Sequence, residues 1–148
     1  MWSERFISFQ FCDDIRQEIG NKFSLIGCYG GIIEVDPIPS VMPKLCALVR
    51  VHTPIERPFL KLVVRILRDD TPVAEVVFPP EAFVGESWKM LGAKGHALRA
   101  MIVMAPFAVE SPCDLRIEAE TEEGTLVGGK VWIHPTAPTG KNTQTHSD

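Results

Sequence analysis

Histidine is the side chain best suited to chemistry near neutral pH, and the sequence holds four. His52 ends an apolar run just before Thr53 and Pro54, where its ring could act as a base or a ligand. His96 lies in the glycine-rich stretch GAKGHALR, which could present it to a bound molecule. A histidine at a strand end more often makes one structural hydrogen bond, so we favour that simpler interpretation.

Neighbouring carboxylates form a second candidate, because some β-sandwiches gather acidic loop residues around calcium. Asp13-Asp14 and Asp69-Asp70 are such pairs, but neither has the alternating Asp-x-Asp spacing of a typical calcium loop. Helix capping and turn formation already account for aspartates at both places. The sequence therefore predicts no metal site.

The cysteines Cys12, Cys28, Cys46 and Cys113 contain no CxxC pair, and their spacing does not supply the ligands of a zinc tetrahedron. Three lie within apolar patterns and Cys113 opens another. We predict four reduced thiols that act as small hydrophobic groups in the core.

Motifs of enzymes and nucleotide-binding proteins are absent: the chain has no GxSxG, GxxxxGK[ST], HExxH, strand-linked GxGxxG or EF-hand loop. We therefore predict no catalytic residues and no cofactor. The alternative is a small-ligand-binding protein or hydrolase with a site at the 80–95 loop. A deep polar pocket joining His52 or His96 to a carboxylate would favour that alternative, and a flat apolar patch would favour protein interaction.

Basic side chains share strand faces in the middle of the chain. Arg50 has the same parity as His52, and Lys61 has the same parity as Arg65 on the next run. If these two runs pair, then Arg50, Lys61 and Arg65 form an outward basic patch that would steer an acidic partner. Ordinary solvated sheet faces are the simpler interpretation of the same pattern.

Twelve prolines punctuate the chain, and proline is expelled from central strands. Between them the sequence predicts strands at 5–12, 22–29, 32–35, 45–52, 59–68, 73–78, 98–105, 113–121 and 125–133. The runs 5–12, 45–52 and 113–121 alternate with period two. The run 98–105 is apolar on both faces, as in a covered central strand. Helical turns are expected at 13–21 and at Pro80, and Gly128-Gly129 indicates a bulge.

These elements lack βαβ alternation and predict an all-β fold. We expect a two-sheet antiparallel β-sandwich, immunoglobulin-like or C2-like, with about eight strands and little helix beyond one short turn. The sandwich domain spans 1–134, and 135–148 is a flexible polar tail.

Composition narrows the range of possible partners. The chain has 148 residues, 45% hydrophobic and 23% charged, with a net charge of −4 and a pI near 5.6. This acidic balance argues against nucleic acid, and no apolar stretch reaches the roughly 20 residues that span a bilayer. The opening MWSERFISFQF lacks a secretory leader, so we expect a cytoplasmic protein that starts at Met1.

The segment FQFCDDIRQEIGNKFSLIGCYGGIIEV, with CDDIR at 12–16 and SLIG at 24–27, is followed by MPKL at 42–45 and a C-terminal hairpin LRIEAETEEGTLVGGKVWI. These motifs resemble a family of small bacterial and prophage-associated β-sandwich proteins of unknown function. The resemblance implies a sandwich fold and adds no catalytic residues. A complete fold without evident chemistry then predicts a non-enzymatic protein-interaction module of bacterial or phage origin. Its partner would be a protein, and self-association is left open.

Overall fold

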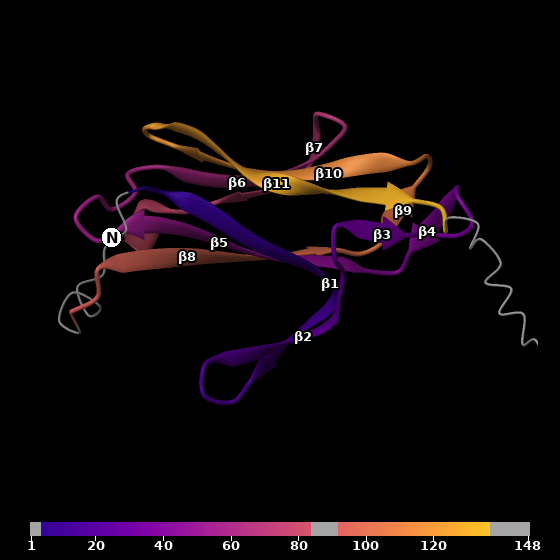
Figure 1. Ribbon diagram of the computed structural model, residues 1–148. Helices are drawn as coiled ribbons and strands as arrows, with labels where there is room; N and C mark the ends of the chain where they lie inside the picture. The colour runs from indigo at the N-terminus through magenta and orange to yellow at the C-terminus, as the bar shows by residue number, and fades with distance from the viewer. Residues whose placement is uncertain (1–3, 84–91, 137–148) are drawn as a thin grey trace, which may run out of the picture.

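The computed structural model describes residues 4–83 and 92–136, and these form an all-β structure of eleven strands. Figure 1 shows two facing sheets, with a long hairpin that leaves the lower one. The predicted all-β sandwich is therefore confirmed in its class and layers. The only helical segment described is the 3₁₀ turn η1 (Pro80–Phe83), at the proline where a turn was predicted.

Sheet A has the order β2-β1-β5-β8, and all its neighbours are antiparallel. Its strands are β1 (Phe6–Glu18), β2 (Lys22–Cys28), β5 (Leu45–Pro54) and β8 (Gly95–Met104).

Sheet B has the order β3-β11-β10-β6-β7. Its strands are β3 (Ile32–Glu34), β6 (Leu62–Arg68), β7 (Thr71–Val77), β10 (Cys113–Thr121) and β11 (Gly124–His134). The pairing of β3 with β11 is parallel, which departs from the purely antiparallel prediction. The short strands β4 (Ser40–Met42) and β9 (Phe107–Val109) form a separate pair at one end.

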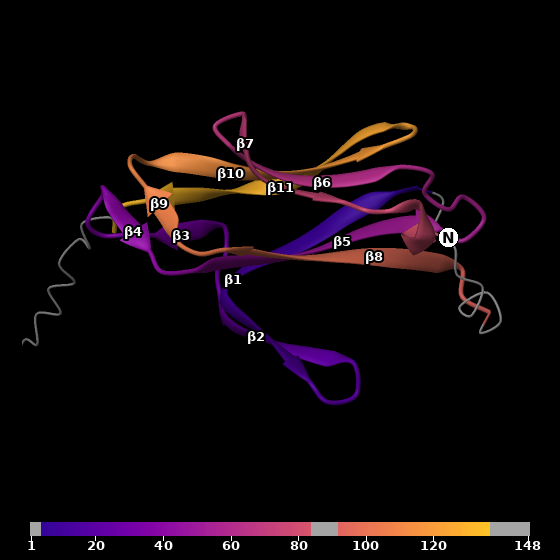
Figure 2. The same ribbon diagram turned by 180° about the vertical axis from the view of Figure 1, so that it is seen from behind.

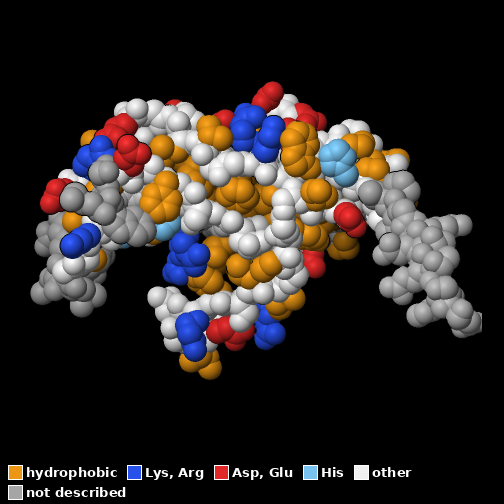
Figure 3. All heavy atoms as spheres, in the orientation of Figure 1, with side chains coloured by type: hydrophobic (Ala, Val, Ile, Leu, Met, Phe, Trp, Pro, Cys, Tyr) orange, Lys and Arg blue, Asp and Glu red, His pale blue; other side chains and the backbone are white. Residues whose placement is uncertain are grey.

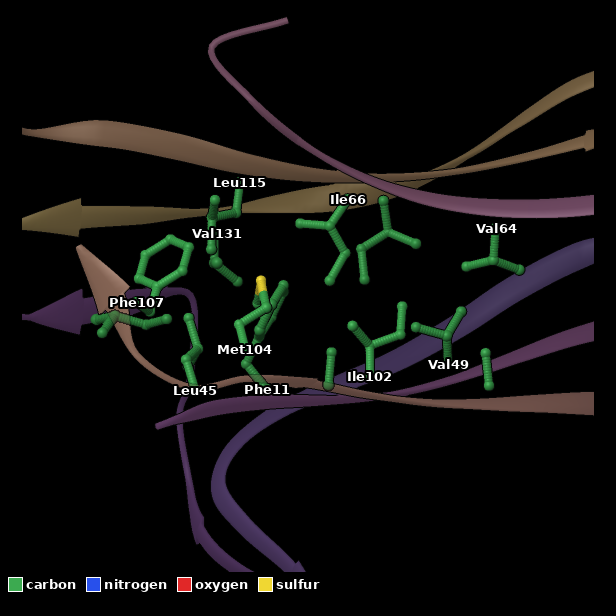
Figure 4. Close-up of a cluster of buried hydrophobic side chains, with 14 of the residues drawn as sticks. Phe11, Leu45, Val49, Val64, Ile66, Ile102, Met104, Phe107, Leu115 and Val131 are labelled. Carbon is green, nitrogen blue, oxygen red and sulfur yellow. The ribbon is translucent and has the colours of Figure 1, made fainter. Parts of the chain in front are cut away.

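The core fills the space between the two sheets, as Figure 4 shows for side chains such as Ile102 of β8 and Ile66 of β6 pointing toward each other. Strand β10 follows the predicted alternation: Leu115 and Ile117 are fully buried, and Arg116 and Glu118 between them are partly exposed. This inward face of alternate residues fixes which side of each strand is left for solvent or ligands.

The predicted bulge at Gly128-Gly129 is also confirmed. The register of β11 against β10 shifts between Ile117 and Glu118, which leaves Gly128 as the extra residue. A Cβ atom at Gly128 would lie 2.8 Å from a methyl carbon of Ile7 on β1, so only glycine fits where the sheets approach.

The segment 13–21 is not a helical turn, and this prediction was wrong. Strand β1 continues through it to Glu18 and pairs with β2 after a tight turn at Gly20 and Asn21, which both have positive φ. Cross-strand pairing outweighs the weak helical signal of the segment. We call this hairpin, residues 13–28, the arm; it projects from sheet A on the side away from sheet B (Figures 1 and 2).

Strand β8 lies at the edge of sheet A, so the predicted central strand at 98–105 was also wrong. Two of its outward side chains are apolar but accessible: Met101 is 39% and Val103 56% exposed. The apolar composition of this run suggested burial on both faces, but one face of β8 exposes its apolar side chains to solvent. The loop part 84–91 and the tail from 137 onward lie outside the described residues. Among the described residues, no helix has the length and apolarity needed to cross a membrane.

Candidate functional site

The outer face of sheet A brings together a row of three polar side chains. Val49 and Val51 of β5 point into the core, so Arg50 between them points outward. Arg50 lies directly opposite Ser8 of β1 on one side and Arg99 of β8 on the other. We call Ser8, Arg50 and Arg99 the guanidinium row.

The two arginines of this row are unusual neighbours, because like charges directly opposite on paired strands repel each other. Among the described residues neither Arg50 nor Arg99 forms an ion pair with a carboxylate. Arg50 is half-buried and Arg99 is exposed. The row therefore concentrates positive charge and hydrogen-bond donors on a protein whose net charge is −4.

The arm covers part of this face. The guanidinium of Arg99 lies over the ring of Phe23 of β2, 4.5 Å from its centroid, which brings the arm over β8. Leu48, also outward on β5 between Gln10 and Met101, is only 3% exposed, so this part of the outer face is covered. Figure 3 shows basic and hydrophobic side chains side by side where the arm meets the body.

His52 lies in the next row of the same face. Its Nε2 is 3.1 Å from the Ser8 hydroxyl oxygen, and its ring stacks on Phe6 with centroids 4.2 Å apart. Burial, together with the charge of Arg50, lowers the pKa of His52 from its usual value. The ring is therefore held neutral near pH 7, where it supplies a hydrogen bond and not a charge.

A shallow pocket of about 260 Å³ joins the two predicted histidines. His52 and His96 line it with Lys94, Gly95 and Ala97, so it begins at the end of the 80–95 loop. None of these described lining residues is a carboxylate. The two predicted histidines open onto the same small pocket.

The predicted patch of Arg50, Lys61 and Arg65 does not form. Strands β5 and β6 lie in different sheets, so the pairing that would unite these residues is absent. Lys61 Nζ is 2.9 Å from Glu120 Oε1, and Arg65 contacts Glu75 and Glu120 at 2.8 Å each. Shared outward parity predicted the face of each residue correctly, but not the sheet to which its strand belongs.

The first acidic pair lies at the base of the arm. Asp13 accepts a hydrogen bond from the Tyr29 hydroxyl, and Asp14 forms an ion pair of 3.1 Å with Lys44, which lowers the pKa of Asp14. The Asp13 carboxylate lies over Gly27, where a Cβ atom would approach it to 2.1 Å. The CDDIR and SLIG motifs are thus joined across the arm, where they have a structural role.

The second acidic pair forms the turn between β6 and β7, with positive φ at Asp69 and Asp70. Asp69 accepts a hydrogen bond from the backbone N–H of Asp114, and Asp70 pairs with Arg116 at 2.7 Å. Within 4–83 and 92–136, no three His, Cys, Asp or Glu side chains are placed to hold a metal ion together.

Sequence reasoning missed two residues of the guanidinium row, Ser8 and Arg99. Parity was available for both: Ser8 alternates with Ile7 and Phe9, and Arg99 alternates with the buried Ala100. What was lacking was the knowledge that β1 and β8 flank β5.

All four cysteines are free thiols, and Cys12, Cys46 and Cys113 are buried as predicted. Cys28 is exposed, so the prediction that every cysteine fills the core was wrong for this residue. It lies on β2, which has left the sandwich with the arm.

No family model matches the chain, and no match was found among curated proteins or solved structures. The functional argument therefore depends on the geometry of the outer face of sheet A.

Proposed function

We propose that this protein is a non-enzymatic binding module that holds an acidic segment of a protein partner on the outer face of sheet A. The observation that carries the proposal is the guanidinium row, in which Arg50 and Arg99 face each other without a carboxylate partner among the described residues. The bacterial or phage setting of this module follows from the sequence resemblance alone.

An acidic side chain or a C-terminal carboxylate fits the row chemically. Each guanidinium can donate two parallel hydrogen bonds to a carboxylate. The Ser8 hydroxyl adds another donor at the end of the row in the His52 tautomer whose Nε2–H donates to Ser8 Oγ. A bound anion would also relieve the repulsion between the two arginines. Phe23 and Met101 supply apolar surface around the row for the rest of the peptide.

Neutralising the row tests the proposal with a fluorescent polyglutamate peptide as the probe. In the double variant Arg50→Gln and Arg99→Gln, we expect the peptide to bind about tenfold or more weakly, because two charge-assisted contacts are lost. Fluorescence anisotropy at low salt measures this, and added salt should weaken wild-type binding.

A matched control removes the same charge from sheet B. The variant Lys61→Gln and Arg65→Gln changes the net charge equally but leaves the row intact, so it should retain wild-type affinity. Equal losses in both variants would mean that the peptide responds to overall charge, and the proposed site would be wrong.

The hydrogen bond between Ser8 and His52 favours a second candidate, a hydrolase that uses this pair. His52→Ala separates the two functions. Under the binding proposal it should weaken polyglutamate binding much less than the double arginine variant does. Hydrolysis of an activated ester that wild type performs and both Ser8→Ala and His52→Ala lack would support the hydrolase instead.

A further inference from the structure

Two thiols face each other at the neck of the arm, where β1 and β2 leave the sandwich. Cys12 of β1 and Cys28 of β2 are direct cross-strand partners. The backbone N–H of Tyr29 donates to the carbonyl of Phe11 at 2.9 Å, so Phe11 and Tyr29 form a hydrogen-bonded pair. Since the two kinds of pair alternate along antiparallel strands, Cys12 and Cys28 form a non-hydrogen-bonded pair. Such pairs bring Cα atoms to about 4.5 Å and side chains closest together, within the range that a disulfide bridges.

Cys46 is the competing partner, because it lies opposite Cys12 on β5. It is fully buried, and its Sγ lies 3.7 Å from the carbonyl oxygen of Asp13, to which it donates a hydrogen bond. By the same alternation, Cys12 and Cys46 form a hydrogen-bonded pair with a wider separation. Cys28 is exposed and can meet an oxidant from solvent.

The pKa of the buried thiol bears on which cysteine reacts first. Burial raises the pKa of Cys12 to about 11, and the charges of Cys46 and Cys28 contribute further. Cys12 is therefore protonated near neutral pH and shielded from solvent, so the first reaction with an oxidant falls to the exposed Cys28.

We propose that Cys12 and Cys28 are a peroxide-sensitive pair that forms a disulfide across the neck of the arm. The Cys28 thiolate attacks one oxygen of hydrogen peroxide, the O–O bond breaks, and hydroxide leaves to give a sulfenic acid. The Cys12 sulfur then attacks the Cys28 sulfur, and the S–O bond breaks. The departing hydroxide leaves as water with the Cys12 proton. Two thiols lose two electrons in total, and one peroxide becomes two waters.

This bond would tie the two strands of the arm together where they leave sheet A, and so restrict the segment that carries Phe23 toward Arg99. The proposal does not rest on the peptide-binding function, because it concerns a covalent change at residues outside the guanidinium row.

The test treats the reduced, full-length protein with hydrogen peroxide, then alkylates it under denaturing, non-reducing conditions. Trypsin cleaves after Arg16, Lys22 and Lys44, so Cys12, Cys28 and Cys46 fall in three different peptides. We expect loss of two of the four alkylatable thiols and one cross-linked species that joins 6–16 to 23–44. Reductant should restore all four thiols.

Two single variants make the assignment specific. Cys28→Ser, at an exposed position, should abolish the cross-link, and Cys46→Ser should retain it. A cross-link between Cys12 and Cys46, a disulfide between two chains through Cys28, or oxidation of Cys28 to a sulfinic acid without a cross-link would each overturn the proposal.

Discussion

The outer faces of the two sheets both carry arginines, but outside the arm, among the described residues, only sheet B pairs them with carboxylates. Arg65 contacts Glu75 and Glu120, and Arg116 contacts Glu118 and Asp70, at distances of 2.7 to 2.9 Å. On sheet A the cross-strand neighbour of Arg50 is a second arginine. The comparison shows that a charged strand face becomes a candidate site through its cross-strand neighbours, since an arginine with a carboxylate beside it is already satisfied.

The ion pairs of sheet B also shift the pKa values of their members, in the direction expected for opposite charges. Hydrogen bonds from Lys61 and Arg65 lower the pKa of Glu120. That carboxylate therefore stays ionised well into acid, and the basic groups beside it are neutralised locally. Sheet B thus has the features of a solvated face, and the four predictions below test how far sheet A differs from it.

The largest loss of stability should come from a substitution in the core between the two sheets. Ile117→Ala removes a fully buried side chain beneath sheet B, and we expect the free energy of unfolding to fall by about 2–5 kcal/mol. Urea denaturation measures the loss. Glu118→Ala, on the outward side of the same strand, should change little, and an equal effect of the two substitutions would contradict the observed register.

The arm is the feature that sheet B lacks, and Gly27→Ala tests what holds it. Gly27 has a φ of 66°, and a Cβ atom there would lie 2.1 Å from the Asp13 carboxylate. We expect a loss of roughly 1–3 kcal/mol in the free energy of unfolding. Gly30→Ala is the matched control, since a Cβ atom there meets nothing within 4 Å. If Gly30→Ala proves as costly in the same urea titration, the clash at the base of the arm is not the cause.

Removing one arginine from each face should have effects of opposite sign. Arg65→Gln breaks two ion pairs and should lower the free energy of unfolding by about 0.5–1 kcal/mol. Arg50→Gln relieves repulsion with Arg99 and should raise the free energy of unfolding by about 0.2–0.5 kcal/mol. Thermal or urea unfolding at low ionic strength resolves the signs. A loss of stability in Arg50→Gln would indicate that Arg50 is already compensated in the free protein.

The smallest effect should be a pH dependence confined to sheet A. The pKa values of His52 and His96 are lowered in the folded protein, mainly by burial, so the unfolded chain binds protons more readily. The contribution of these two histidines to the free energy of unfolding is therefore fully present above the usual histidine pKa of 6.5. It is lost as the pH falls from there through their lower pKa values in the folded protein. On sheet B, hydrogen bonds from Lys61 and Arg65 lower the pKa of Glu120, so this carboxylate stays ionised in the same pH interval.

Urea denaturation between about pH 7 and about pH 5 measures this slope. The double variant His52→Gln and His96→Gln should flatten it. An unchanged slope in that variant would assign the pH dependence to other groups.

Local alternation in the sequence determined the strands and their inward faces. The period of two along 113–121 placed Leu115 and Ile117 in the core correctly, and Gly128-Gly129 indicated the bulge where β11 approaches β1. These features could be predicted because each depends on residues adjacent in the chain: side chains alternate between faces along a strand, and glycine admits close backbone approach.

Only the tertiary structure decided which strands are neighbours. Alternation assigns a side chain to a face but does not specify the strand beside it, because pairing depends on burial of the whole core and on the paths of the connections. The chain crosses from sheet A to sheet B between β5 and β6, which separates Arg50 from Lys61 and Arg65. It returns to sheet A at β8, which sets Arg99 beside Arg50. The guanidinium row therefore exists only in the folded protein, because Ser8, Arg50 and Arg99 come from three strands that are far apart in the chain.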